Sequence, residues 1–219
     1  MKCLLIVFIS LFSFLVKAQF FGNIALKTGV GIGQQNKTSE ILNEDNGLVF
    51  AWAIGLEPEL LVFGNAQQFK LTFDLFYMQK GGQNTSFIQI YDQFGQLQSK
   101  GSTSTGSYLN YFSLTPCYKF QFGKMFFAKA GPRLDIFCTS HFGDLPPGEY
   151  SPDSFYTYES VTYGISYGFG FQFGEKKLSY LLEFLGQNDF TSSSSNSSTG
   201  QTFQNNAYLL NLGLVYAIK

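Results

Sequence analysis

The sequence predicts an all-β protein, an eight-stranded antiparallel transmembrane up-and-down β-barrel with short periplasmic turns and long extracellular loops. Three observations support this prediction. Aromatic residues make up 18% of the 219 residues and charged residues only 13%, a balance that is unusual for a water-soluble protein. Apolar and polar residues alternate with period two in eight segments, which places them on opposite faces of strands. The connections between these segments are alternately long and short, as in bacterial transmembrane barrels.

The alternation is clearest in residues 161–173, where every second residue is apolar and the residues between are small or polar. Seven more strands are expected within residues 24–33, 48–59, 69–77, 108–122, 126–136, 178–184 and 208–218. In all eight, the apolar face has no charged residue, and nearly every charge in a strand lies on the other face. No stretch after residue 20 has the 18 or more consecutive apolar residues of a membrane helix.

The connections between the expected strands are of two kinds. Tight turns are expected near residues 64–67, 123–124 and 174–177, and long polar loops near residues 34–47, 80–107, 138–158 and 187–206. The Ser-rich tract 191–200 is of low complexity, so we expect it to be mobile. Because a bacterial barrel has its short turns on the periplasmic rim, the long loops should face the outside of the cell.

Which face of the strands points inward distinguishes two classes of barrel. A soluble lipid-binding barrel is apolar inside, and a membrane barrel is apolar outside. The charged face carries many small residues that fit a narrow interior. The Phe, Tyr and Leu side chains of the other face are expected to be too bulky for an eight-stranded lumen. We therefore expect the apolar face to point outward. Aromatic girdles should then lie at the two membrane interfaces, formed by Tyr77, Tyr108, Tyr163 and Tyr208 on the outer rim and Phe122, Phe126, Phe173 and Tyr216 on the inner rim.

The charged face should line the lumen, and its charges are the candidate site. Nine residues form it, with Glu59 on the same face: Lys27, Glu57, Lys70, Asp74, Lys119, Lys129, Arg133, Asp135 and Glu183. Eight strands leave room only for side chains in the interior, and charges buried there must be paired. We expect an ion-pair network that plugs the barrel. The alternative is that this network lines a narrow ion path.

Residues 1–18 are expected to be a cleaved secretory signal peptide, which leaves residues 19–219 as one outer-membrane β-barrel domain. Lys2 supplies the positive charge, residues 4–16 form the apolar segment, and Ala18 precedes the expected cleavage site. A signal anchor is the alternative, but about 13 apolar residues are too few to cross a bilayer as a helix. Cys117 and Cys138 lie too far apart on one expected hairpin to form a disulfide, so we expect two free thiols.

The sequence predicts no enzyme site, no cofactor and no metal. A net charge of −1 offers no basic stripe for nucleic acid. His141, the single histidine, is expected in a solvated loop without the orienting partner that a catalytic base needs. One histidine and two separated cysteines cannot form a closed metal site. The run Gly29-x-Gly31-x-Gly33 lies on a strand that no helix follows, so a nucleotide-binding loop is not expected.

Several motifs resemble, in their order along the chain, those of a family of small outer-membrane β-barrels from Bacteroidota that includes PorT-like proteins. These motifs are residues 74–81 with their final Lys-Gly pair, residues 108–122 around Pro116 with the following Ala-Gly-Pro at 130–132, residues 166–170, and residues 206–218. The resemblance covers roughly the whole mature chain. It implies an outer-membrane barrel, and a few members of the family are associated with protein secretion or cell-surface machinery.

The end of the chain resembles the signal that directs barrels to their assembly machinery. Asn211, Gly213, Tyr216 and Ile218 reproduce the pattern polar-x-Gly-x-x-aromatic-x-hydrophobic, although Lys219 stands where many barrels end in an aromatic residue. We expect a non-enzymatic structural, interaction or secretion-accessory barrel, and alternatively a small porin-like channel. The expected partners are outer-membrane lipid, the barrel-assembly machinery and an envelope or secretion protein. A lipid-modifying enzyme that uses His141 is a distant third hypothesis.

Overall fold

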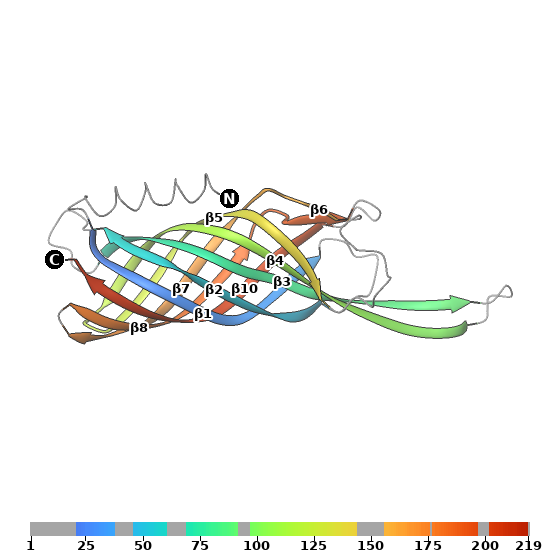
Figure 1. Cartoon of the computed structure of the whole chain (residues 1–219), viewed down its shortest axis with the longest axis horizontal. Coiled ribbons are helices and arrows are strands. Elements are labelled where there is room, and N and C mark those ends of the chain that lie inside the picture. Colours follow the sequence, from blue (N-terminus) through green and yellow to red (C-terminus); the bar gives the residue numbers. More distant parts are fainter. Residues whose placement is uncertain are drawn as a thin grey trace.

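The computed structural model is a closed β-barrel of eight long antiparallel strands (Figure 1). It describes residues 21–37, 46–60, 69–91, 97–143, 156–175, 177–196 and 202–218. The barrel strands are β1 (Phe21–Lys37), β2 (Asn46–Leu60), β3 (Phe69–Tyr91), β4 (Leu97–Phe122), β5 (Phe126–Gly143), β7 (Val161–Glu175), β8 (Leu178–Asp189) and β10 (Thr202–Ala217). The predicted all-β barrel fold is therefore confirmed. The expected signal peptide, residues 1–18, lies outside the described residues.

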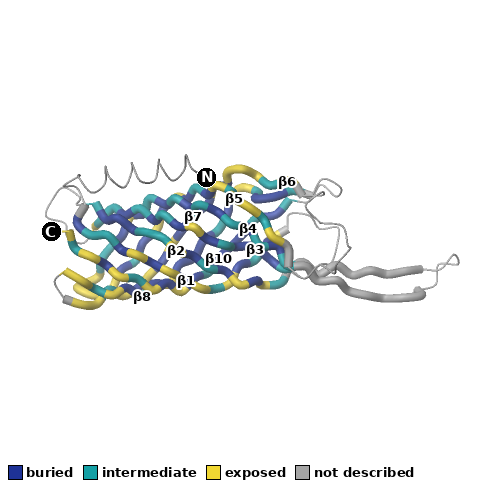
Figure 2. Tube along the Cα trace, in the orientation of Figure 1, coloured by how far each residue is buried: buried dark blue, intermediate teal, exposed yellow. Residues whose placement is uncertain are grey.

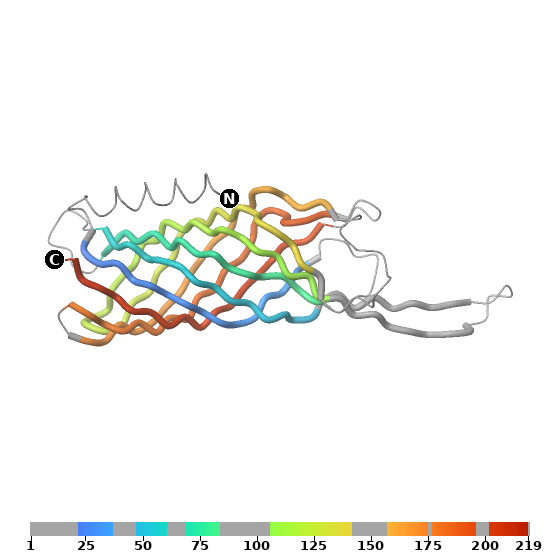
Figure 3. The backbone as a smooth tube through the Cα atoms, viewed as in Figure 1, coloured from blue at the N-terminus to red at the C-terminus, as the bar shows by residue number. Residues whose placement is uncertain are grey.

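Each long strand pairs with the strand that precedes it around the wall, and β1 closes the barrel by pairing with β10. Figure 3 shows the chain running up and down around the barrel in this order. The first and last strands meet at one rim, where the backbone N–H of Ile218 donates a hydrogen bond to the carbonyl of Gly22 at 3.0 Å. Closure gives every long strand a hydrogen-bonding neighbour on both sides, so the wall satisfies its own backbone. In the described part of the chain, no helix is long and apolar enough to cross a membrane.

The outer wall of the barrel is apolar, as the alternation predicts. Buried residues alternate with more exposed ones along most of the barrel wall (Figure 2). Phe169 and Leu212 are each 59% exposed, and Tyr163 is 56% exposed. The side chains expected to form the two girdles lie on this outer face as well, with Tyr108 and Tyr208 only partly exposed. The outward direction of the apolar face is confirmed.

The interior holds larger side chains than the sequence predicts. Phe76, Tyr111 and Phe127 are almost completely buried, as are Leu185 and Leu209. The expectation that such residues are too bulky for this lumen was wrong. They fit because they share the interior with small residues. The alanines at positions 51, 53 and 207 lie in one cluster with Phe76 and Tyr111, and Ala25 lies in a second cluster with Phe127.

The strands on the loop side are longer than predicted. The expected loop 80–107 is largely a hairpin, because the pairing of β3 with β4 continues to Tyr91 opposite Leu97. The neighbouring strands stop earlier, where β2 pairs with β3 at Asn46–Asn84 and β4 pairs with β5 at Gly106–Gly143. Residues 85–91 and 97–105 thus form a two-stranded ribbon beyond the barrel (Figure 1). We call it the β3–β4 ribbon.

One smaller expectation for the loop side was also wrong. His141 lies on β5 and not in a loop. In the Ser-rich tract, the short strand β9 (Ser194–Asn196) pairs with β10 and with β6 (Tyr156–Tyr158). Ser193 and Ser194 are buried there. On the opposite rim, the turn predicted near residues 123–124 is present and spans residues 123–125, with Gly123 at a φ of 65°, while the turn expected at 64–67 lies outside the described residues.

Candidate functional site: the charged lumen

Six charged residues meet inside the half of the barrel that is nearer the short turns. They are Lys27, Glu57, Asp74, Lys119, Lys129 and Glu183, from six different strands. None is more than 4% exposed. Three are cations and three are anions, so the group is electrically neutral. We call it the turn-side cluster. All six belong to the predicted lumen site, and the structure brings them together.

Lys129 is the centre of the turn-side cluster. Its Nζ lies 2.5 Å from Asp74 Oδ2, 2.7 Å from Glu183 Oε1 and 2.9 Å from Glu57 Oε2. Lys27 pairs with the same three carboxylates, with Nζ at 2.9 Å from Glu183 Oε2 and 3.5 Å from Asp74 Oδ1, and in direct contact with Glu57. Two cations are thus shared by three anions. Removing one ion therefore changes several contacts at once.

The cluster is extended at its edge toward the turn rim. Lys119 Nζ donates to Glu57 Oε1 at 3.0 Å and lies 3.9 Å from Glu59 Oε2. Glu59 in turn pairs at 2.9 Å with Lys70, whose side chain is 23% exposed. Lys70 therefore joins the predicted network only through Glu59, at the end of the network that faces solvent.

A second group of charges fills the half of the barrel nearer the long loops. It contains Arg133 and Asp135, which the sequence predicts, and Lys80 and Asp189, which it missed. Lys80 Nζ lies 2.5 Å from Asp135 Oδ2 and 2.9 Å from Asp189 Oδ1. Arg133 contacts Asp189, and its Nε lies 2.9 Å from Asp135 Oδ2. This loop-side cluster has two cations and two anions, so it is neutral as well.

The signal for the two missed residues was present in the sequence. The inward positions of β3 are even-numbered, so continuing from Asp74 by twos reaches Lys80. The inward positions of β8 are odd-numbered, so continuing from Glu183 reaches Asp189. Both were omitted because the expected strands ended at residues 77 and 184.

Apolar side chains separate the two charged clusters. On β3, Phe76 and Met78 lie between Asp74 and Lys80. They belong to a buried apolar group with Leu185 and Leu209 from the far wall. A second buried apolar group lies on the turn side and consists of Ala25, Phe127, Leu181 and Val215. The lumen is therefore layered, with charged and apolar groups in alternation along the barrel.

Contacts also cross the lumen from wall to wall. β4 and β10 are four strands apart in either direction around the barrel. Asn205 on β10 nevertheless donates a hydrogen bond from Nδ2 to the hydroxyl of Tyr111 on β4 at 3.2 Å, and to Ser193 Oγ at 2.7 Å. Side chains of opposite walls thus meet at the loop-side end of the lumen.

The remaining candidate residues lie apart from these clusters. His141 is exposed, and its ring centroid lies 6.4 Å from that of Tyr108. Cys117 is buried and Cys138 exposed, and both are free thiols as predicted. Within the described ranges, no group of three or more His, Cys, Asp or Glu residues could hold a metal ion.

The four residues of the assembly-signal pattern divide between the two faces of β10. Tyr216 and Ile218 are exposed on the outer wall, at 53% and 46%. Asn211 is buried in the lumen, where its Nδ2 donates to Glu183 Oε2 at 3.0 Å. Gly213 lies opposite Lys27 in the β1–β10 register. Asn211 therefore also takes part in the turn-side cluster.

No protein-family model matches the sequence, and no curated protein is a significant match. Among solved structures, the chain is similar to Ail, the attachment invasion locus protein of Yersinia pestis, at a TM-score of 0.40 and 11% identity over 90% of this chain and 99% of that chain. It is also similar to OprG of Pseudomonas aeruginosa (0.47, 9%, 90% and 96%) and to the outer membrane protease OmpT of Escherichia coli (0.46, 9%, 92% and 99%). At such identities and TM-scores, these likenesses say nothing about what this chain does.

Proposed function

We propose that this chain is a non-enzymatic outer-membrane β-barrel with a sealed lumen. The apolar outer wall supports a membrane location, because exposed residues such as Phe169, Leu212 and Tyr163 would otherwise face water. A closed wall satisfies its backbone without solvent, as a strand protein in hydrocarbon must. The paired charges inside match the polar interior of a membrane barrel. Membership of the PorT-like family is part of this proposal.

The contact between Lys80 and Asp189 is the single observation that carries the sealed lumen. Their strands are four apart in either direction around the wall, yet the two side chains lie 2.9 Å apart. Salt bridges across the lumen, together with the apolar layer around Phe76, occupy the space that a water-filled pore would need. Because both clusters are neutral, they also present no excess charge to attract ions of one sign.

A sealed barrel acts through its rims and its outer surface. The rim on the loop side carries the β3–β4 ribbon, which extends past the last pairings with β2 and β5. Within the described ranges, no other strand pairs with residues 85–91 or 97–105 of the ribbon, and a strand edge of this kind can pair with a partner strand. We propose that the barrel anchors this ribbon for contact with an envelope or secretion protein. Outer-membrane lipid and the barrel-assembly machinery are its other proposed partners.

Solute flux into vesicles tests the sealed lumen. The mature chain is refolded into phospholipid vesicles, and insertion is followed by the heat-dependent shift of folded barrels on gels. Swelling in an arabinose solution should then match that of empty vesicles. Faster swelling with confirmed insertion would contradict the sealed barrel. Failure to insert would contradict the membrane location itself.

One observation favours the porin-like channel as a second candidate. Thr115, Thr162, Ser166 and Gln187 have buried side-chain polar atoms with no hydrogen-bond partner among the described residues. They come from β4, β7 and β8, and further unpaired polar atoms lie on Thr72 of β3 and Asn211 of β10. Buried polar groups normally bind protein or ordered water. Water bound to these groups would provide a narrow path beside the ion pairs.

A further inference from the structure

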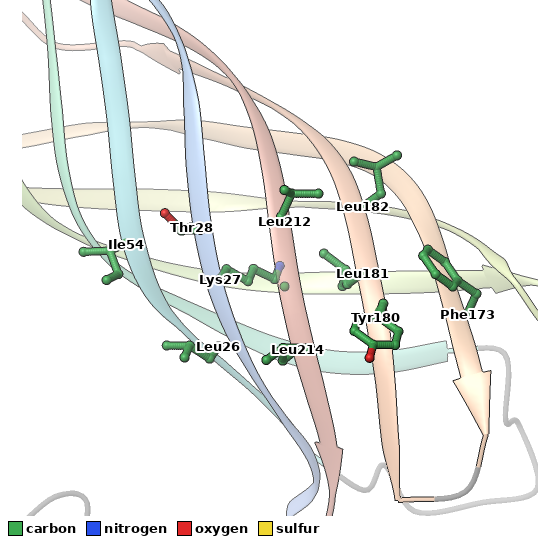
Figure 4. A pocket seen from close by; sticks show the side chains of 11 residues that line it. Leu26, Lys27, Thr28, Ile54, Phe173, Tyr180, Leu181, Leu182, Leu212 and Leu214 are labelled. Carbon is green, nitrogen blue, oxygen red and sulfur yellow. The ribbon is translucent and has the colours of Figure 1, made fainter.

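A hollow of about 580 Å³ lies in the outer wall where β8, β10 and β1 run side by side (Figure 4). Most of its lining residues point outward on these strands, among them Leu26, Leu182, Leu212 and Leu214, and the inward-facing Lys27 and Leu181 border it from the same strands. Phe173 and Tyr180 close one side, with their rings stacked at a centroid distance of 5.8 Å. The hollow is therefore apolar and opens on the face that would contact hydrocarbon.

The hollow has a local cause in the sequence. Thr28 is the small residue of an outward row in which it pairs with Leu212 on one side and with Ile54 on the other. Its hydroxyl donates to the carbonyl of Ala53 at 3.3 Å, so its polar atom is satisfied by the wall. The smaller side chain leaves space between its larger neighbours and adds no unpaired polar group.

One end of the hollow becomes polar. Figure 4 shows the hydroxyl of Tyr180 directed toward the turn that joins β7 and β8. Lys177 lies in that turn and is exposed. Three residues of strand span about 10 Å, so the backbone of Lys177 lies about that far along the chain from Tyr180. The carbonyl of Lys177 accepts a hydrogen bond from the backbone N–H of Ala217 at 2.9 Å, which holds the turn against the end of β10.

We infer that this hollow binds one glycerophospholipid, with an acyl chain against Thr28 and the phosphate paired with Lys177. The order of apolar surface, tyrosine hydroxyl and cation matches the order of acyl chain, ester region and phosphate along such a lipid. This inference rests on the proposed membrane location. It goes further because it assigns a specific lipid position to one part of the outer wall.

Native mass spectrometry of the full mature barrel tests the site. The protein is refolded into vesicles of phosphatidylglycerol and phosphatidylcholine, extracted in mild detergent, and scored for the phospholipid that remains bound. Thr28→Phe fills the hollow, and Val30→Phe is its control, since Val30 is outward on the same strand but does not line the hollow. Lys177→Gln removes the cation, and Lys124→Gln is its control in another exposed turn on the same rim.

The wild type and both controls should keep one phosphatidylglycerol per barrel. Thr28→Phe should lose it, and Lys177→Gln should weaken its binding about fivefold, as expected for one lysine at a charged membrane surface. Equal loss in the controls, or no bound lipid in a barrel that has inserted, would overturn the lipid site alone. A bound second copy of the chain would overturn it in favour of self-association. A chain that fails to insert, as judged by the gel shift, would overturn the membrane location and the lipid site together.

Discussion

Lys80 and Asp189 face each other across the full width of the barrel, with Nζ 2.9 Å from Oδ1. Lys80 lies on β3 and Asp189 on β8, which are opposite strands of the closed wall. Each residue has a second partner, Asp135 for Lys80 and Arg133 for Asp189. Buried ion pairs therefore join opposite walls of the barrel. Their loss should change both the stability and the permeability of the barrel.

Loss of the central cation should strongly destabilise the barrel. Lys129→Met leaves Glu57, Asp74 and Glu183 with too few cations in a buried site. We expect a loss of about 3–5 kcal/mol in the free energy of unfolding. Urea titration of the protein in vesicles, followed by the fluorescence of Trp52, measures it.

A charge-balanced variant separates pairing from other effects of this substitution. Lys129→Met combined with Asp74→Asn restores neutrality in the turn-side cluster and should recover part of the loss. Lys124→Met removes a lysine from an exposed turn and should have little effect. Suppose that adding Asp74→Asn lowers the free energy of unfolding further, by the full cost of a second unpaired group. Lys129 and Asp74 would then not be coupled as described.

The apolar layer between the two clusters should also contribute to stability. Phe76→Ala removes a completely buried ring from this layer, and we expect a cost of about 3–5 kcal/mol. Phe73→Ala, on the outer face of the same strand, is the matched control and should cost less. Unfolding in urea compares the two variants. Equal costs would show that the lumen is not packed as described.

The strands, and which of their residues point into the lumen, were predictable because side chains of a barrel wall alternate between its two faces. Glu57, Asp74 and Glu183 follow this period in the sequence and point into the lumen. Strand ends were harder to predict. Gly81 and Gly82 suggest a turn, but in the barrel they allow close approach of strands, since a Cβ on Gly81 would lie 1.8 Å from the carbonyl oxygen of Ser107.

The partners of each charge were not predictable from the sequence. Which side chains meet across a lumen depends on how far the strands are staggered around the wall. Lys27, for example, pairs with Glu183, from which it is 156 positions away in the chain. The strand within the Ser-rich tract was missed because its composition does not show that Ser193 forms hydrogen bonds with Phe203 and Asn205 of the following strand β10.

The two cysteines should differ sharply in reactivity. Cys138 is exposed and Cys117 is completely buried in the lumen. In the mature chain refolded into vesicles, a maleimide should add once, and Cys138→Ser should abolish this addition. Unfolding in urea should allow two additions to the wild type. Mass spectrometry counts the adducts, and rapid labelling of Cys117 in the folded protein would contradict a closed interior.

The pattern at the end of the chain should matter for assembly in cells more than for the stability of the folded barrel. Tyr216→Ala removes the aromatic residue of the proposed assembly signal from the outer face of β10. We expect less folded barrel in outer-membrane fractions, measured by the gel shift. Tyr163→Ala is the control, because Tyr163 is similarly exposed but lies on β7. An equal decrease for both variants would argue against recognition of this pattern.

Single-channel recording in a planar bilayer tests the sealed lumen most directly. The wild type is compared with Arg133→Ala and Glu183→Gln, which disturb the loop-side and turn-side clusters separately. We predict no steady openings from inserted wild-type protein and a leak in the variants, because unpaired charges would draw water into the lumen. Steady openings of the wild type would contradict the sealed barrel and would make the lumen charges the lining of an ion path.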